Sequence, residues 1–197
     1  MENVRIAFEE FEGDKIPPGY QEIRCDIIFD IKMSENFRRK ARMVADGHRT
    51  EAPEALTYSS VVSRDAVRIA LTIAALNDLK VLACDIQNAY LTKNCRKKVW
   101  MRAGPEFGLD AGKRMLIVRA LYGLKSSGAA FRSLLAETLH DLGYKPTKAD
   151  PDVWLRPAVM PDGFEYYELV IFYVDEVLCM SHDAMRTMKG IQRSFKL

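Results

Sequence analysis

The chain has 197 residues, a net charge of +2 and 48% hydrophobic residues, which suffices for one or two domains with a real core. No apolar run approaches the ~18 residues of a membrane span and no signal peptide is visible, so we expect no membrane partner. The four cysteines lack CxxC spacing and the three histidines form no ligand cluster. Free thiols in a reducing, intracellular compartment are therefore expected.

Charge is distributed unevenly along this nearly neutral chain. Residues 1–31 carry three basic and eight acidic side chains, whereas residues 92–132 carry ten basic and two acidic ones. A segment as basic as the second can contact the phosphates of a nucleic acid. An ordinary solvated face explains the charge alone equally well.

The first half of the chain predicts a hairpin, a helix and a buried strand. Residues 1–20 are acidic and end in Ile-Pro-Pro-Gly-Tyr, which indicates a loosely ordered lead-in. Residues 23–33 and 37–45 predict two strands of a basic hairpin, and residues 47–60 carry mainly turn residues. Apolar residues then recur at helical spacing from Ser63 or Arg64 to Asn77. The apolar stretch 80–86 predicts a strand with an acidic residue at its end.

The second half predicts further short strands and two helices. Residues 99–102 and 115–120 are strand candidates, followed by a loop over 121–128. A helix is expected from Ser126 or Ser127 to Leu142, with Gly143 ending it. The last strands fall within 152–156 and 166–180, and a final helix begins at Ser181 or Asp183. This order of elements indicates the α+β class with a mixed or antiparallel sheet.

Two acidic positions stand at the ends of apolar strands. The stretch 171–178, Ile-Phe-Tyr-Val-Asp-Glu-Val-Leu, places Asp175 and Glu176 where a two-residue turn would let them converge. A divalent cation with a preference for oxygen ligands, such as Mg²⁺, would relieve their repulsion. A solvated acidic turn is the simpler alternative. Asp85 stands at the end of another apolar strand, 90 residues before Asp175. A sheet that places this strand beside the acidic hairpin would suit two-metal phosphoryl transfer.

Five motifs occur in a fixed order along the chain. They are Lys40-Ala-Arg-Met-Val-Ala-Asp-Gly, Asp85-Ile-Gln-Asn-Ala-Tyr-Leu, Ala120-Leu-Tyr-Gly-Leu-Lys, Lys148-Ala-Asp-Pro-Asp-Val-Trp and Tyr173-Val-Asp-Glu. In this order and spacing, residues 16–197 resemble the reverse transcriptase of copia-type LTR retrotransposons. The resemblance implies fingers and palm regions, with a ferredoxin-like antiparallel palm sheet packed on helices. It assigns residues 21–84 to the fingers, together with the first helix and strand of the palm. Residues 85–197 would form the palm, with an inserted fingers loop.

The resemblance also implies an activity and a metal site. The activity is template-directed addition of deoxynucleoside triphosphates to a primer 3′-hydroxyl, on RNA or DNA. Two Mg²⁺ ions, or Mn²⁺, would be held by Asp85, Asp175, Glu176 and the backbone carbonyl of Ile86. One ion would activate the attacking hydroxyl and the other would stabilise the pyrophosphate leaving group.

Further residues would bind the nucleotide and the template. Tyr90 would fill the space of a ribose 2′-hydroxyl and so select deoxynucleotides, although a half-buried core aromatic is the simpler reading. Lys40 and Arg42 would neutralise the triphosphate, unless they form an ordinary solvated strand face. The complete nucleotide-binding set is Lys40, Arg42, Asn88, Ala89, Tyr90, Gly123 and Lys125. The cations expected on the nucleic acid are Arg96, Lys97, Lys98 and Arg119.

Two departures from the family pattern matter. Glu176 replaces the second aspartate of the hairpin and is longer by one methylene, roughly 1.5 Å; since a shift of about 1 Å can cost roughly 10²-fold, we expect a weakened polymerase. The chain also ends before the primer-gripping segment, thumb and RNase H of a Pol polyprotein. By analogy with the family, a cytoplasmic particle is the expected location.

Two other functions stay open. One is a decayed, non-catalytic nucleic-acid-binding remnant, which Glu176 and the missing thumb favour. The other is a different palm-type nucleotidyl transferase or cyclase, against which the basic hairpin and the Leu-Tyr-Gly-Leu-Lys loop argue.

Overall fold

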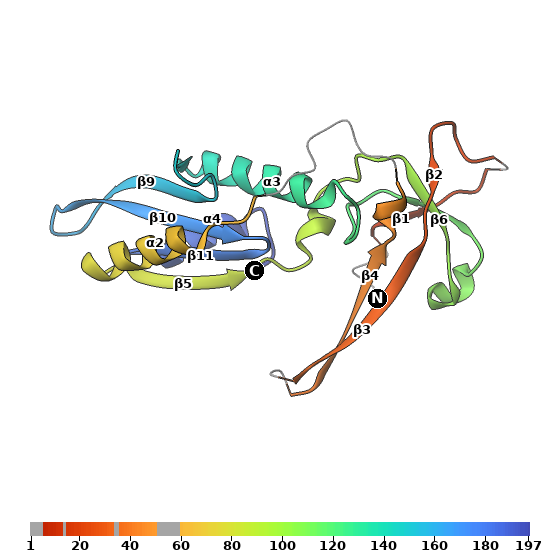
Figure 1. Cartoon of the computed structure of the whole chain (residues 1–197), viewed down its shortest axis with the longest axis horizontal. Coiled ribbons are helices and arrows are strands. Elements are labelled where there is room, and N and C mark those ends of the chain that lie inside the picture. The colour runs from red at the N-terminus through yellow and green to blue at the C-terminus, as the bar shows by residue number, and fades with distance from the viewer. Residues whose placement is uncertain (1–5, 14, 34–35, 51–59) are drawn as a thin grey trace. The chain divides into compact units, whose positions relative to one another are not determined.

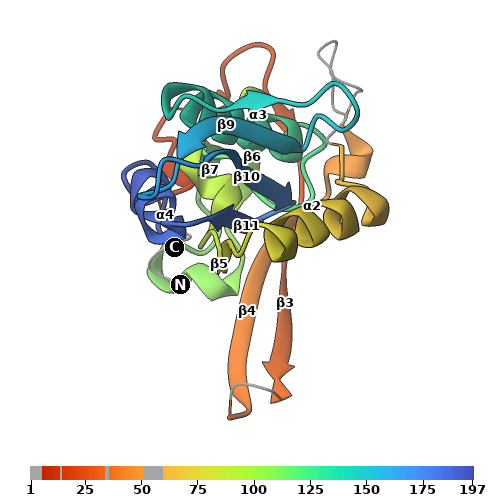
Figure 2. The same ribbon diagram turned by 90° about the vertical axis from the view of Figure 1, so that its left-hand side faces the viewer.

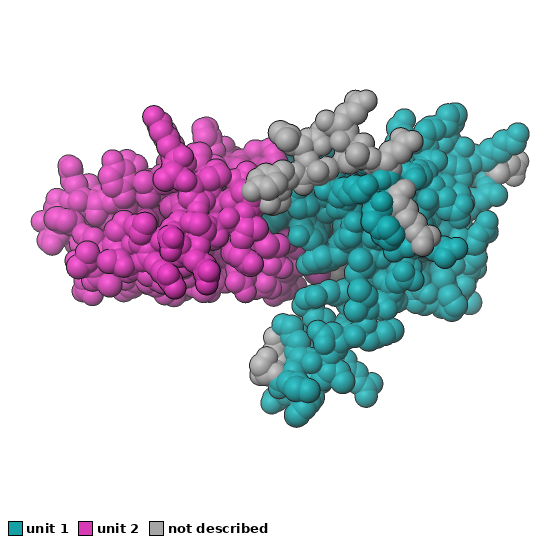
Figure 3. All heavy atoms as spheres, viewed as in Figure 1, with its two compact units in different colours: residues 1–58, 90–131 teal, residues 59–89, 132–197 magenta. Residues whose placement is uncertain are grey.

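A computed structural model describes residues 6–13, 15–33, 36–50 and 60–197. The chain divides into two compact units that are interleaved in sequence, residues 1–58 with 90–131 and residues 59–89 with 132–197 (Figure 3). The predicted ranges 1–20, 21–84 and 85–197 do not coincide with these units. The strand that ends at Asp85 finds its sheet partners after residue 132, so residues 59–89 group with the C-terminal part.

The first unit contains a four-stranded sheet with the strand order β1-β7-β6-β2. Its strands are β1 (Phe8–Glu10), β2 (Gln21–Glu22), β6 (Val99–Arg102) and β7 (Arg114–Ile117). Short 3₁₀ turns cover Gly47–Arg49, Ala89–Thr92 and Pro105–Asp110. The expected loosely ordered lead-in is wrong for residues 7–10, because β1 pairs antiparallel with β7 and Ala7 is fully buried.

A two-stranded ribbon also belongs to this unit and consists of β3 (Cys25–Lys32) and β4 (Arg38–Ala45) (Figures 1 and 2). The predicted basic hairpin is therefore confirmed. At one end of β4, the Ala45 amide donates to the Tyr122 carbonyl at 2.7 Å. Gly123, with φ 88°, lies so close to β4 that an added Cβ would come within 2.0 Å of the Ala45 carbonyl oxygen. This close approach explains the glycine in the 121–125 loop.

The second unit is built on a five-stranded antiparallel sheet with the order β5-β11-β10-β9-β8. The strands are β5 (Lys80–Asp85), β8 (Lys145–Pro146), β9 (Val153–Val159), β10 (Glu165–Tyr173) and β11 (Glu176–Ser181). One face contacts α2 (Arg64–Leu76), and α4 (Ala184–Gln192) packs on β5 and β11 (Figure 2). The helix α3 (Ser127–Asp141) begins in the first unit and continues into the second.

Helix starts follow the capping residues that the sequence offers. The Ser63 hydroxyl accepts from the Ala66 amide at 3.1 Å and caps α2, so the helix begins at Arg64, one of its two predicted starts. The Asp183 carboxylate accepts from the Arg186 amide at 3.2 Å and caps α4. Of the two predicted starts for the last helix, Ser181 is wrong, because it still belongs to β11. Among the described residues, no helix is long and apolar enough to cross a membrane.

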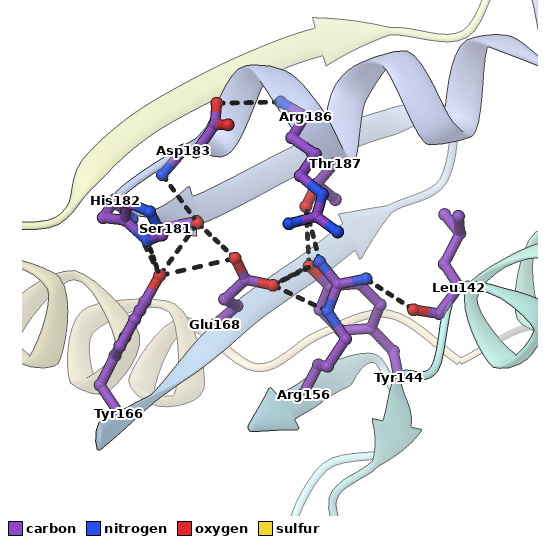
Figure 4. A network of polar contacts seen from close by, with 10 residues as sticks. All are labelled: Leu142, Tyr144, Arg156, Tyr166, Glu168, Ser181, His182, Asp183, Arg186 and Thr187. Atoms are coloured by element: carbon purple, nitrogen blue, oxygen red, sulfur yellow. Dashed lines mark hydrogen bonds and ion pairs between the residues drawn. The ribbon is translucent and has the colours of Figure 1, made fainter. Parts of the chain in front are cut away.

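A buried polar network joins three strands of this sheet to α4 (Figure 4). Glu168 is only 4% exposed, and its carboxylate accepts from Arg156 Nε at 2.8 Å and from Ser181 Oγ at 2.6 Å. The Tyr144 hydroxyl donates to it at 3.1 Å and lies 2.8 Å from the Thr187 hydroxyl on α4. Burial alone would raise the pKa of Glu168, but the hydrogen bonds from Ser181 and Arg156 outweigh it and lower that pKa. Glu168 is therefore ionised at neutral pH.

Candidate functional site

The acidic hairpin turns one residue earlier than predicted. Strand β10 ends at Tyr173 and β11 begins at Glu176, and these two residues form the last register pair. The turn therefore consists of Val174 and Asp175, and the expected Asp175-Glu176 turn is wrong. Val174 has φ 56°, which is rare for a β-branched residue. Such strained residues cluster at functional sites.

The sheet brings Asp85 beside this hairpin. Its register partner on β11 is Glu176, and directly opposed residues on antiparallel strands project to the same face. The Ile86 amide also donates to the Asp175 carbonyl at 2.8 Å. The expected meeting of Asp85 with the acidic hairpin is thus confirmed, although the residues' roles stay predictions. Asp85 and Glu176 are exposed, and Asp175 is half-buried.

These two exposed acids line a groove of about 650 Å³ within the second unit. Its other lining residues include apolar side chains of the sheet and α2, the aromatic ring of Tyr173, and two cations of α2, Arg64 and Arg68. Tyr173 begins the motif Tyr173-Val-Asp-Glu, but no site role was predicted for it, nor for Arg64 or Arg68. The four-residue spacing of the arginines was the available signal, because it places both on one side of a helix.

The carboxylates of the hairpin and of Asp85 meet part of the requirements of a divalent-ion site. Within the described ranges, no group of three or more His, Cys, Asp or Glu side chains has the spacing of a metal cage. Mg²⁺ seldom needs one, because it is commonly held by one or two carboxylates together with substrate phosphates and water. The opposed pair Asp85 and Glu176, with Asp175 beside it, matches that kind of incomplete oxygen site.

Several predicted nucleotide-binding residues meet in the first unit. Lys40 and Arg42 alternate along β4 and therefore share a face. The Arg42 guanidinium lies 5.9 Å from the ring centre of Tyr122. Tyr90 contacts the same ring edge-on, with the centroids 4.5 Å apart. Tyr122, which stands in the Ala120-Leu-Tyr-Gly-Leu-Lys motif, thus contacts two predicted site residues.

The remaining predicted nucleotide-binding residues differ in their burial and contacts. The Lys125 ammonium donates to the Thr50 carbonyl at 2.6 Å, a contact that holds the loop carrying Gly123. Asn88 is exposed with φ 52°, whereas Ala89 is fully buried. Tyr90 is half-buried and also lies edge-on to Phe131, with centroids 6.1 Å apart. This packing agrees with either reading of Tyr90, a sugar contact or a core aromatic.

The four cations predicted to contact nucleic acid line one groove of about 500 Å³ in the first unit. Arg119 donates to the Asn94 side-chain oxygen at 2.8 Å at its margin. Tyr20 and Glu9 also line the groove, and neither was singled out from the sequence. Its cations are Arg96, Lys97, Lys98 and Arg119. Cations combined with an aromatic ring are typical of grooves that bind single-stranded nucleic acid.

Comparison with known proteins defines the class of this chain. The chain belongs to a reverse transcriptase family, because the family model described as "Reverse transcriptase (RNA-dependent DNA polymerase)" matches residues 9–197. This confirms the family indicated by the five sequence motifs.

Curated relatives of the chain include Pol polyproteins of transposons. The chain is 26% identical over 196 residues to the "Retrovirus-related Pol polyprotein from transposon TNT 1-94" of Nicotiana tabacum. It is 27% identical over 192 residues to the "Retrovirus-related Pol polyprotein from transposon RE2" of Arabidopsis thaliana. The matches cover 93% and 92% of this chain but only 14% and 13% of these relatives. The chain thus corresponds to a small part of each polyprotein.

Proposed function

We propose that this chain is the fingers and palm part of an RNA-directed DNA polymerase that extends a primer with deoxynucleoside triphosphates. The single observation that carries the proposal is the register of Asp85 with Glu176, next to the hydrogen bond between Ile86 and Asp175. The second unit would be the palm. Apart from β8 and β9, which stand between α3 and β10, its elements β5, α3, β10–β11 and α4 follow the β-α-β-β-α order of a ferredoxin-like sheet.

The acids would hold two divalent ions, Mg²⁺ or Mn²⁺, with Asp85 and Asp175 as the main ligands and Glu176 beside them. When bound, such ions activate the primer hydroxyl and neutralise the leaving pyrophosphate. The Ile86 carbonyl would add a neutral oxygen. Because the Ile86 amide is already bonded to the Asp175 carbonyl, the backbone itself fixes the spacing of the two aspartates.

Separate residues would bind the triphosphate, the sugar and the region of the base. Lys40 and Arg42 would neutralise the triphosphate from one face of β4, and Tyr90 would contact the sugar. Tyr122 supports this arrangement, because its ring packs against both Arg42 and Tyr90. Amides of Asn88 and Ala89 would bind phosphate oxygens, and Gly123 and Lys125 would shape the loop near the templating base.

The template and the other domains are proposed partners. Arg96, Lys97, Lys98 and Arg119 would contact template phosphates in the basic groove. Thumb and RNase H parts of a Pol polyprotein would complete the enzyme. A cytoplasmic particle stays a prediction.

Primer extension tests the proposal directly. Asp85→Asn or Asp175→Asn is expected to lower the extension rate roughly 100-fold or more, since even ~1 Å misplacement at a catalytic centre costs that much. Asp141→Asn removes an exposed carboxylate at the end of α3 and serves as the matched control, which should extend at the wild-type rate. Extension that survives both active-site variants would overturn the proposal.

A decayed nucleic-acid-binding remnant is the second candidate, and Glu176 favours it. This reading predicts that the chain binds primer–template but adds no nucleotide with either Mg²⁺ or Mn²⁺. Measuring binding and extension on the same preparation separates the two functions.

A further inference from the structure

One of the five sequence motifs has no role in the proposed reaction. It is the segment Lys148-Ala-Asp-Pro-Asp-Val-Trp, which leads into β9. Its second aspartate, Asp152, is fully buried, and aspartates are almost never fully buried unless they are paired. The partner of Asp152 therefore indicates what this motif does.

That partner is Arg132 on α3. Arg132 Nε donates to Asp152 Oδ1 at 2.9 Å, and a second guanidinium nitrogen lies 2.7 Å from the same oxygen. The other carboxylate oxygen, Oδ2, is buried and has no hydrogen-bond partner among the described residues. The buried carboxylate thus depends on Arg132 and fixes where the guanidinium lies.

The same guanidinium contacts the strand that leads into the acidic hairpin. Its central carbon lies 5.7 Å from the ring centre of Phe172, a cation–π contact. Phe172 is 3% exposed, and its amide donates to the Asp152 carbonyl at 3.3 Å. Its ring centre also lies 6.4 Å from that of Trp154. Phe172 is thus held by Arg132 and by two residues of the motif.

Phe172 stands directly before the hairpin, on the other face of the sheet from the acids. It pairs with Val177, and the next pair, Tyr173 with Glu176, closes the hairpin. Because successive side chains of a strand alternate between faces, Phe172 points away from the face of Tyr173 and Glu176. The turn contains Val174 at φ 56°, and such strained backbone persists only where surrounding contacts hold it. The contacts of Phe172 are of this kind.

We infer that Arg132 and Asp152 position the acidic hairpin from the opposite face of the sheet. They are positioning residues, because they act through Phe172 and not on the reacting atoms. For its effect on catalysis, the inference rests on the proposed function.

The effect extends to the acid on the neighbouring strand. The Ile86 amide donates to the Asp175 carbonyl at 2.8 Å, and Asp85 is the residue before Ile86. A hairpin that moves would therefore lose this hydrogen bond and change the distance between the two aspartates.

A purely structural ion pair is the alternative, and the same sheet contains a matched example. Arg156 Nε donates to the Glu168 carboxylate at 2.8 Å, and its guanidinium lies 4.4 Å from the ring centre of Tyr144. The side-chain exposures are alike, 28% and 0% in the first pair and 23% and 6% in the second. Glu168 lies about 17 Å along β10 from the hairpin, so this second pair stabilises the unit without contacting the hairpin.

The experiment makes the same substitution in both pairs, Arg132→Lys and Arg156→Lys. Lysine keeps the positive charge but loses the planar guanidinium that donates twice and stacks on a ring. Two quantities are measured on each protein. One is the hydrogen exchange of the Ile86 amide by NMR, relative to the Leu169 amide in the middle of β10, which corrects for a change in global stability. The other is primer extension.

In Arg132→Lys, the relative exchange of the Ile86 amide should be roughly tenfold faster, as expected for the loss of one desolvated cation–π contact. The kcat should fall by up to roughly 100-fold, if the displacement is about 1 Å, while the KM values for primer–template and deoxynucleotide stay unchanged. Asp152→Asn should change both quantities in the same direction, because asparagine keeps an oxygen for Arg132 but loses the charge. Arg156→Lys should lower the urea midpoint and leave both quantities at wild-type values.

Wild-type exchange of Ile86 in Arg132→Lys, or equal changes in both lysine variants, would overturn the inference. A wild-type chain that extends no primer would instead overturn the proposed function. The exchange of Ile86 would still decide whether the pair positions the hairpin.

Discussion

Position 176 decides how this site would work, because a glutamate there directly opposes Asp85. An aspartate would place its carboxylate one methylene closer to the strand. The longer, exposed side chain of Glu176 has more rotamers to lose when it binds an ion, and Mg²⁺ demands near-ideal geometry. In the proposed polymerase, Glu176 would therefore be a less suitable metal ligand for rapid catalysis than aspartate.

Glu176→Asp is therefore expected to increase the primer-extension rate, by up to roughly 100-fold if the misplacement is about 1 Å. Single-turnover extension with Mg²⁺ measures the chemical step. Glu165→Asp, at the exposed start of β10, makes the same chemical change away from the groove and should have no effect. Equal rates for Glu176→Asp and wild type would show that this side chain does not limit the reaction.

The sequence allowed the acidic part of the site to be predicted, but not its cationic part. Asp85 and Asp175 stand at the ends of apolar strands, where alternation and turn chemistry are informative. Arg64 and Arg68 look like any solvated helix face in sequence, because nothing local tells which side of α2 borders a groove. The turn was displaced by one residue because Val174 adopts a positive φ, a conformation that local propensity disfavours.

Among the elements, the second unit depends on polar as well as apolar packing. The network around Glu168 joins β9, β10 and β11 to α4 and encloses an ionised carboxylate. The spacing of apolar residues predicted these strands and the helix, since each contains enough of them to show the period of its secondary structure. It missed β1, which has three residues and pairs with a strand more than a hundred positions later.

The network should make stability depend on pH in a defined direction. The pKa of Glu168 is lowered from its ordinary value of 4.5 by hydrogen bonds that outweigh burial. Its stabilising contribution is therefore complete above about pH 4.5 and is lost as the pH falls below it. At pH 7, Glu168→Gln should lower the free energy of unfolding by about 3–5 kcal/mol, because Arg156 loses its buried partner.

Urea unfolding between pH 7 and pH 3 measures this effect. The difference between wild type and Glu168→Gln should shrink as the pH falls, because protonation removes the same charge from the wild type. Glu165→Gln is the control, since it changes an exposed carboxylate on the same strand. A difference that stays constant down to pH 3 would contradict the assigned role.

At the scale of the whole molecule, the net charge of +2 is the sum of acidic and basic segments that lie apart in the sequence. The uneven sequence already predicted a basic segment at 92–132, and four of its ten cations line one groove. What the sequence could not show is that Tyr20 and Glu9, from the acidic N-terminal part, line it as well. Distant segments of the chain form this surface, because β2 pairs with β6 and β1 pairs with β7.

This basic groove should bind single-stranded template through both charge and stacking. Lys97→Gln/Arg119→Gln is expected to reduce the log–log salt slope for a labelled single strand by about 1.4, at roughly 0.7 per contact. Tyr20→Ala should weaken binding about tenfold through lost stacking, whereas Tyr20→Phe should preserve it. Lys145→Gln/Lys189→Gln, which removes two exposed charges from the second unit, should leave the slope unchanged. If that control reduces the slope as much as the groove variant does, binding follows net charge and the groove has no special part in it.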